Sequence, residues 1–193
     1  FIDEIQADMA LFGARQCPLA EVAECAAANS ITFGAPTKTF NLAGVVSSYA
    51  IVPDAGLRRR FFDWLRAREL NEPTVFAPIA TIAAFRRGET WRREMLAYVE
   101  DNIRFVEAYC RDHLPAVRPV RPEAGFLVWL DCRRLGLNRE QLLDLFVDKA
   151  HLALNDGEMF GTGGAGFMRL NVGTPRAVLE QAMRQLAEAI AQL

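Results

Sequence analysis

Short apolar runs alternate along this chain with longer stretches in which apolar residues recur every three or four positions. The short runs predict buried strands at residues 30–34 and 44–52. Phe1 and Ile2 are followed abruptly by two acidic residues, which is typical of the end of a buried strand. Because that strand begins at the first residue, with no initiator Met, we expect the chain to be a fragment or a processed form.

Helical spacing dominates the middle of the chain. The Ala-rich stretch 19–29 predicts a short helix, and Asp54 is placed to cap a helix that carries a solvated basic patch at residues 58–60. Further helices are predicted at 75–87 and 89–113. The second of these repeats apolar residues at Met95, Val99, Ile103, Val106 and Cys110. We therefore expect it to be long and amphipathic.

The pattern changes after Leu114, where short elements of both kinds are mixed. Strands are predicted at 117–120, 126–130, 152–154 and 167–172, and helices at 138–150 and from Thr174 onwards. The chain contains no internal repeat and no low-complexity stretch. The order of elements predicts an α/β fold for the first half and a smaller α+β unit from about residue 89, with the long helix bridging the two.

The composition is that of a folded protein without a strongly charged surface. Hydrophobic residues make up 51% and charged residues 24%, and 22 basic residues nearly balance 24 acidic ones. This balance argues against a nucleic-acid partner, and no apolar run reaches the roughly 18 residues of a membrane span. The four cysteines have no metal-ligand spacing, so we expect no metal site and reduced thiols in a cytoplasmic protein.

Lysine is rare in this chain, which draws attention to the two that are present. Of the 22 basic residues, only Lys38 and Lys149 are lysines. Lys38 follows a predicted strand and lies in a predicted loop, residues 35–41, beside hydroxyl, amide and aromatic side chains. An amine can condense with an aldehyde to form a Schiff base, which a guanidinium cannot do. The alternative interpretation is an ordinary loop lysine that faces water.

Two further side chains are candidates for a ligand site. Asp3 ends a predicted strand, where open α/β sheets bind ligands, although it could equally be a turn or cap residue. Arg169 lies among apolar residues in a predicted strand and requires a carboxylate, either from a structural salt bridge or from a substrate. The four glycines within residues 161–166 lead into a strand rather than a helix. They predict a flexible loop near a ligand instead of a dinucleotide fingerprint.

Together, residues 3–8, 35–44 and 160–171 resemble the C-terminal part of a pyridoxal-phosphate (PLP) enzyme of the class I/II aminotransferase superfamily, fold type I. Residues 122–131 are similar to the small domain of its bacterial cystathionine β-lyase or C–S lyase branch. The resemblance covers essentially the whole chain. It implies that residues 1–88 form the end of the large PLP-binding domain and residues 89–193 a small α+β domain with the bridging helix.

The resemblance also implies roles for individual residues. Lys38 would form the internal Schiff base (aldimine) with pyridoxal 5'-phosphate and then move the Cα proton of the substrate. Asp3 would keep the pyridine nitrogen protonated, and Thr37 would contact the phosphate. Gln6 stands where many relatives have Tyr or His against the 3-hydroxyl oxygen, and it can donate a hydrogen bond but cannot ionise. Arg169 would hold the α-carboxylate of the substrate.

Two departures from the family pattern bear on cofactor binding. Val46 occupies the position where aminotransferases often carry a phosphate-binding arginine, so the phosphate must be held by other groups. The family's N-terminal half, with its Gly-rich phosphate turn and ring-stacking aromatic residue, has no counterpart in this chain. The chain is therefore expected to contain only part of a cofactor site.

The resemblance favours a C–S β-lyase. In such an enzyme a sulfur group leaves from Cβ of an amino acid, and the remainder yields pyruvate and ammonia. An aminotransferase acting on an amino acid and keto acid pair is the alternative, since it uses the same lysine, aspartate and arginine. A non-catalytic ligand-sensing module with the same fold is a further hypothesis, which Gln6 and the missing half support. By resemblance we expect a cytoplasmic homodimer with a small-molecule amino-acid substrate.

Overall fold

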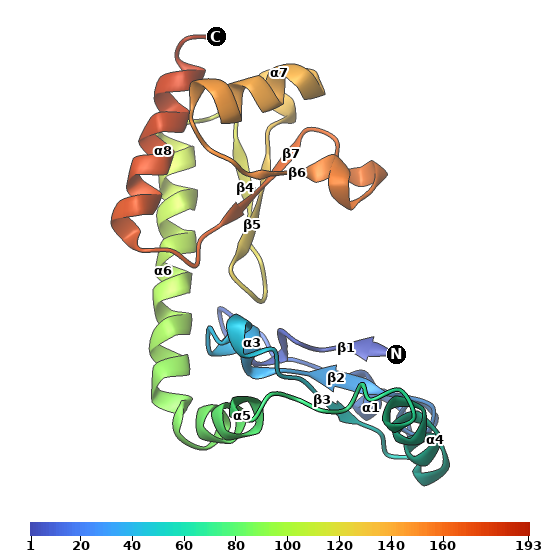
Figure 1. Cartoon of the computed structure of the whole chain (residues 1–193). Helices are drawn as coiled ribbons and strands as arrows, with labels where there is room; N and C mark the ends of the chain where they lie inside the picture. The colour runs from blue at the N-terminus through green and yellow to red at the C-terminus, as the bar shows by residue number, and fades with distance from the viewer. The chain divides into compact units, whose positions relative to one another are not determined.

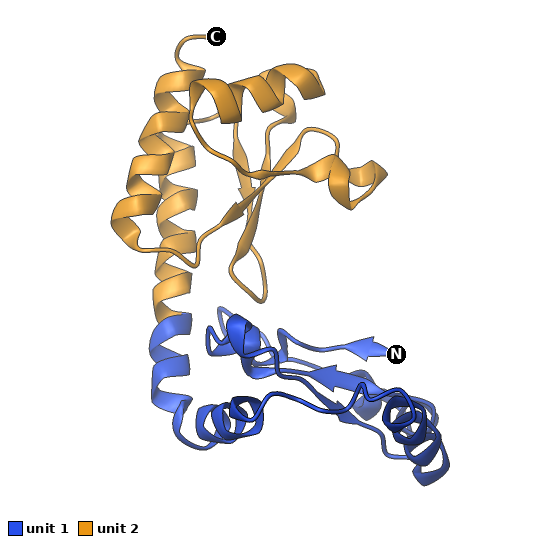
Figure 2. Ribbon diagram, in the orientation of Figure 1, with its two compact units in different colours: residues 1–96 blue, residues 97–193 orange.

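The computed structural model describes residues 1–193 (Figure 1). The chain divides into two compact units, residues 1–96 and 97–193, which are coloured separately in Figure 2. The long helix α6, Glu89–His113, contributes residues to both units. The predicted domain boundary between residues 88 and 89 falls at the start of this helix. None of the helices is long and apolar enough to cross a membrane.

Unit 1 contains a three-stranded sheet in the order β1 (Ile2–Asp3), β2 (Thr32–Gly34) and β3 (Tyr49–Ile51). β1 and β2 are parallel, whereas β3 runs antiparallel to β2. The carboxyl ends of β1 and β2 and the amino end of β3 therefore lie at the same end of the strands, the carboxyl edge of the sheet. The predictions of strands at the start of the chain and at residues 30–34 are confirmed, but the first strand is not buried, because Phe1 is 91% exposed and Ile2 only half-buried.

The predicted buried strand at residues 44–52 is wrong in both length and burial. Its first residues form a 3₁₀ turn, Ala43–Val45, and Val46 adopts a left-handed conformation with φ 51°. Only β3 remains as a strand, and 55% of Ile51 is exposed. β3 pairs only with β2, so its apolar side chains have few neighbours in this unit.

The helices of unit 1 are mostly short. They are α1 (Leu19–Val22), α2 (Glu24–Ala28), α3 (Pro36–Thr39), α4 (Ala55–Arg66) and α5 (Phe76–Arg87). The single helix predicted at residues 19–29 is interrupted at Ala23, whose backbone is extended. Neither half buries a residue, and short helices without packing have little to stabilise them. The predicted cap of α4 is confirmed, since Asp54 Oδ1 accepts the Leu57 N–H at 2.6 Å.

Unit 2 is built on an antiparallel sheet in the order β4-β5-β7-β6. Its strands are β4 (Arg118–Val120), β5 (Leu127–Asp131), β6 (Asn155–Asp156) and β7 (Phe167–Asn171). α8 (Arg176–Ile190) runs beside α6 in this unit (Figure 1). The strand predicted at residues 152–154 is wrong, because pairing with β7 begins only at Asn155. The helix predicted at residues 138–150 consists of α7 (Arg139–Asp144) and a π-helical turn, Leu145–Lys149.

The two faces of the unit 2 sheet differ in burial. Val128, Leu130, Met168 and Leu170 are buried, whereas the alternating positions, among them Trp129 and Arg169, are only half-buried. The core of the unit also contains the apolar side of α6 (Val99, Ile103, Val106 and Cys110) and that of α8 (Leu179, Met183, Leu186 and Ala189). The predicted amphipathic period of α6 is thus confirmed.

Candidate functional site

Lys38 lies on α3, a single helical turn directly after β2, rather than in the predicted loop. Ala35 is extended and Pro36 follows as the first helical residue, where its fixed φ suits a helix start. The turn closes when Phe40 N–H donates to the Pro36 carbonyl at 2.8 Å. The side chain of Lys38 is exposed, so it is available to a ligand at this edge of the sheet.

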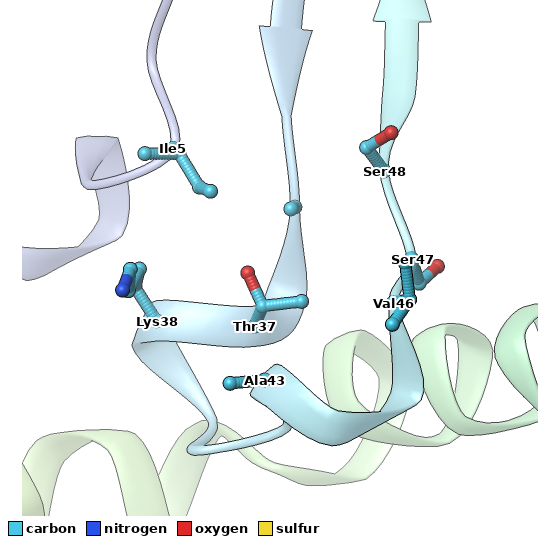
Figure 3. A pocket seen from close by; sticks show the side chains of 8 residues that line it. Ile5, Thr37, Lys38, Ala43, Val46, Ser47 and Ser48 are labelled. Atoms are coloured by element: carbon cyan, nitrogen blue, oxygen red, sulfur yellow. The ribbon is translucent and has the colours of Figure 1, made fainter.

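A cavity of about 340 Å³ opens beside Lys38. Figure 3 shows Lys38 and Thr37 projecting from α3 toward Ile5, with Ser48 across the cavity at the start of β3. The complete lining is Ile5, Ala35, Thr37, Lys38, Ala43, Val46, Ser47 and Ser48. The carboxyl edge of parallel strands is where open α/β sheets bind ligands, and the volume suits a small molecule.

The hydroxyls that line this cavity are not equivalent. Ser47 Oγ lies 2.7 Å from Thr81 Oγ1, and Thr81 in turn donates to the Ala77 carbonyl at 2.7 Å. Since a hydroxyl has one proton, Ser47 must donate to Thr81, and its oxygen can then only accept from a ligand. Thr37 and Ser48 have no such partner. They are the two lining hydroxyls able to donate to an anion.

Asp3 ends β1 at the same edge of the sheet as Lys38. Its Oδ1 accepts the N–H of Ile5 at 3.1 Å, which fits the interpretation of Asp3 as a turn residue. The carboxylate is nevertheless exposed and forms no ion pair with any basic side chain. One of its oxygens therefore holds the turn, and the other can interact with a ligand.

Gln6 follows three residues later, at the start of the 3₁₀ turn Ala7–Met9. Its carbonyl accepts the Met9 N–H at 3.0 Å, and Met9 is fully buried. The side chain of Gln6 is half-buried and is not part of the cavity lining. The backbone around Gln6 is therefore anchored, which leaves its amide free to turn toward a ligand.

Tyr49 is a feature of this edge that the sequence did not single out. Its ring covers Gly34, where a Cβ atom would lie 2.5 Å from the ring, and stacks edge-on with Phe85 at 5.9 Å between centroids. Burial raises the pKa of Tyr49, and the carboxylates of Asp8 and Glu4 raise it further. Its hydroxyl therefore stays protonated at neutral pH and can donate a hydrogen bond.

Arg169 lies on β7 in unit 2, directly opposite Trp129 of β5. Its Nη2 donates to Asn155 Oδ1 at 2.9 Å, and its guanidinium carbon lies 4.3 Å from the centre of the Phe160 ring. Nε is buried and has no hydrogen-bond partner, and no carboxylate pairs with this guanidinium. The structural salt bridge considered as one alternative is absent, so the charge is available for an external anion.

The glycine-rich segment after β6 forms two 3₁₀ turns, Gly157–Phe160 and Thr162–Gly164. The turns pack so closely that a Cβ atom on Gly164 would collide with the Gly157 carbonyl. Asp156, which is buried, anchors the first turn by accepting from Glu158 N–H at 3.1 Å and from Arg139 Nε at 2.6 Å. The segment predicted to be a loop thus forms two short turns, with residues 161–163 exposed, and Phe160 lies against Arg169.

The predicted site residues thus fall into two groups. Lys38, Thr37, Asp3 and Gln6 lie at or beside one sheet edge of unit 1, and Arg169 lies on the sheet of unit 2. Sequence reasoning did not single out Ser48, Tyr49 and Asn155. No local pattern marks these three residues, because their places beside the predicted residues depend on the pairing of strands. Trp129 and Phe160 stood within recognised motifs but without a role.

Comparisons with known proteins agree with the motifs. The chain is 37% identical over 188 residues to cystathionine β-lyase PatB of Bacillus subtilis, which covers 97% of this chain and 49% of PatB. It is 31% identical over 155 residues to protein MalY of Escherichia coli, covering 80% of this chain and 40% of MalY. No protein-family model matches the chain.

Among solved structures, cystalysin from Treponema denticola, which contains a pyridoxal 5'-phosphate cofactor, superimposes with a TM-score of 0.90. The sequence identity is 27%, and the match covers 98% of this chain and 48% of cystalysin. The chain therefore has the fold of the C-terminal part of a PLP-dependent enzyme of fold type I.

Within that class, the chain is similar to a cystathionine β-lyase and to other PLP-dependent relatives, and the resemblance predicted from the motifs is confirmed. The chain spans about half the length of the curated relatives it matches.

Proposed function

We propose that the full-length protein is a PLP-dependent C–S β-lyase and that this chain supplies its reactive lysine. The observation that supports this most directly is the cavity at the carboxyl edge of β1 and β2, which brings one amine together with two donor hydroxyls. These groups fit the cofactor chemically, since its aldehyde requires an amine and its phosphate requires hydrogen-bond donors. The relatives named as cystathionine β-lyases favour this activity.

The residues of unit 1 would hold the cofactor. Lys38 Nζ would bind its aldehyde carbon, and Thr37 and Ser48 would donate to its phosphate in place of the arginine that Val46 replaces. When bound, PLP supplies an electron sink that stabilises negative charge at Cα of the substrate. The Asp3 carboxylate would hold a proton on the ring nitrogen, and Gln6 would donate to the 3-hydroxyl oxygen.

Two residues of the chain would act on the substrate. Lys38 Nζ, once released, would accept the proton from Cα, because an amine held beside that carbon is a suitable general base. Arg169 would bind the α-carboxylate through its free donors, with Asn155 and Phe160 fixing the plane of the guanidinium. Transamination would use the same groups, so the fate of the substrate separates the two reactions.

We further propose that the protein works as a cytoplasmic homodimer. Large apolar side chains are exposed on unit 1, among them Phe76, Ile79 and Ile82 of α5, and such surfaces are typical of interaction sites. All four cysteines are free thiols, which fits a reducing compartment. Sedimentation of the full-length protein would test the dimer, and a monomer at micromolar concentration would contradict it.

The lyase proposal is tested by incubating the full-length holoprotein with cystathionine and measuring pyruvate, with and without an added keto acid. We expect pyruvate without the keto acid, since elimination needs no acceptor. Product formation that requires the keto acid would identify an aminotransferase instead. A protein that shows no visible absorbance of bound cofactor, before or after borohydride, would support the ligand-sensing module.

A further inference from the structure

Unit 2 contains a second cavity, of about 470 Å³, that the proposed reaction does not use. It lies on the half-buried face of the sheet, the face that carries Trp129. The lining side chains are apolar or aromatic, and the lining consists of Val120, Trp129, Gly157, Phe160, Gly163, Gly164 and Phe167. Its volume is that of a small-molecule pocket, and its chemistry suits an apolar group.

Packing holds the walls of this cavity in place. The Trp129 ring meets Phe160 edge-on at 5.3 Å between centroids and Phe167 at 6.3 Å. The close approach of Gly157 to Gly164 fixes the turn on which Phe160 is carried. The aromatic side chains that line the pocket thus contact one another and form its wall.

Arg169 does not line this cavity, but its guanidinium lies against the Phe160 ring that does. Trp129 and Arg169 are direct cross-strand partners, so their side chains share one face of the sheet. Phe160 contacts both, meeting Trp129 edge-on and lying under the guanidinium of Arg169. An anion bound to Arg169 would therefore have an apolar pocket beside it. A second arginine, Arg133, lies 4.8 Å from the centre of the Phe167 ring, with its charge paired to Asp131.

We propose that this cavity binds the side chain of the amino acid whose α-carboxylate pairs with Arg169, and that Trp129 and Val120 select substrates with a bulky apolar thioether group. The identity of the ligand as an amino acid rests on the proposed function. The pairing of an anion site with an adjacent aromatic pocket rests on the geometry of unit 2 alone. Small side chains would bind less well, since they leave the pocket empty.

Two carboxylates that lack an amino group test the pocket without turnover. The probes are 3-(benzylthio)propanoate and 3-(methylthio)propanoate, and their dissociation constants are measured by calorimetry on the full-length holoprotein. We expect the benzyl probe to bind about tenfold more tightly than the methyl probe, because it fills the cavity. In Trp129→Ala this ratio falls toward one. Trp64→Ala, which removes an exposed tryptophan from α4, keeps the wild-type ratio.

A second variant tests the pocket in case Trp129→Ala does not fold. Val120 lies on the edge strand β4 and is 47% exposed, so a larger side chain should be tolerated there. Val120→Trp would fill part of the cavity. We expect Val120→Trp to raise the dissociation constant of the benzyl probe at least about fivefold more than that of the methyl probe. The circular dichroism spectrum should be unchanged. An unchanged ratio in both variants would overturn the proposal, as would a wild-type protein that binds the two probes equally.

The outcomes also separate this proposal from the lyase function. If another part of the full-length protein fills the cavity, Trp129→Ala will lower the melting temperature and leave the ratio unchanged, which contradicts the pocket. If pyruvate is not formed from cystathionine but the probe preference depends on Trp129, the lyase function fails and the pocket stands. If pyruvate is formed and the probe preference does not depend on Trp129, the lyase function stands and the pocket fails.

Discussion

The two units are almost equal in length but differ in how they bury apolar side chains. Most of the fully buried apolar residues belong to unit 2, where α6 and α8 contribute regularly spaced ones. Most of the large exposed apolar residues belong to unit 1, including Phe76, Trp64 and Ile51. Unit 2 thus encloses its own core, whereas the short strands and helices of unit 1 leave apolar surface uncovered.

The units also carry different chemistry. The less enclosed unit presents an amine and hydroxyls at a sheet edge, on short connections that follow or precede strands. The well-packed unit presents a guanidinium held by Asn155 and Phe160 on a regular sheet. We infer that unit 1 supplies the reactive groups and unit 2 supplies a binding surface. The following predictions test that division of roles.

The largest effect is expected from Lys38→Ala in the full-length holoprotein. Loss of the general base should reduce kcat by about 10²–10⁴-fold, and borohydride should no longer fix the cofactor to this peptide. Lys149→Ala is the matched control, because Lys149 is exposed and pairs with Asp144 at 3.2 Å. Peptide mapping that finds the label on Lys149 would refute the role of Lys38.

The difference in burial can be measured with one substitution made in each unit. Phe146→Ala in unit 2 empties a fully buried position and should lower the free energy of unfolding by about 3–5 kcal/mol. Phe76→Ala in unit 1, at a side chain that is 76% exposed, should change it by less than about 0.5 kcal/mol. Urea unfolding of the 193-residue chain gives both values. Equal losses of unfolding free energy in the two variants would show that the difference in burial between the units does not affect stability.

A binding role for unit 2 predicts that Arg169→Ala raises KM more than it lowers kcat. Charged hydrogen bonds to a carboxylate contribute about 1.5–3 kcal/mol, so KM for the amino-acid substrate should rise about 10–100-fold. Arg184→Ala, at an exposed arginine on α8, should leave KM unchanged. An unaltered KM in Arg169→Ala would remove this residue from the substrate site.

The smallest effect concerns the acid sensitivity of unit 2. Arg133 donates to both oxygens of Asp131, at 2.9 and 2.7 Å, and this hydrogen bonding holds the pKa of Asp131 below its ordinary value. A lowered pKa stabilises the fold above the unfolded pKa of about 3.9, and this contribution is lost as the pH falls through the lower, folded value. Asp131→Asn should therefore flatten the acid limb of stability measured by urea unfolding. An identical pH profile would show that the pair contributes nothing.

Local pattern was sufficient for much of this protein. The spacing of apolar residues in α6, the helix after Thr174, the cap at Asp54 and the position of Lys38 after a strand are short-range features, and the structure confirms them. The mixed order of elements likewise indicated an α/β unit followed by an α+β unit. Such features can be predicted from sequence because helix period, capping and strand alternation depend on neighbours within a few residues.

Tertiary structure decided everything that depends on a distant partner. It decided that β3 is an exposed edge, that Ser48 and Thr37 face one cavity, and that Arg169 has Phe160 and Asn155 beside it but no acid. Those outcomes follow from strand register and from which side chains meet across the sheet. Register is set by the packing of the whole unit, so no window of the sequence contains it.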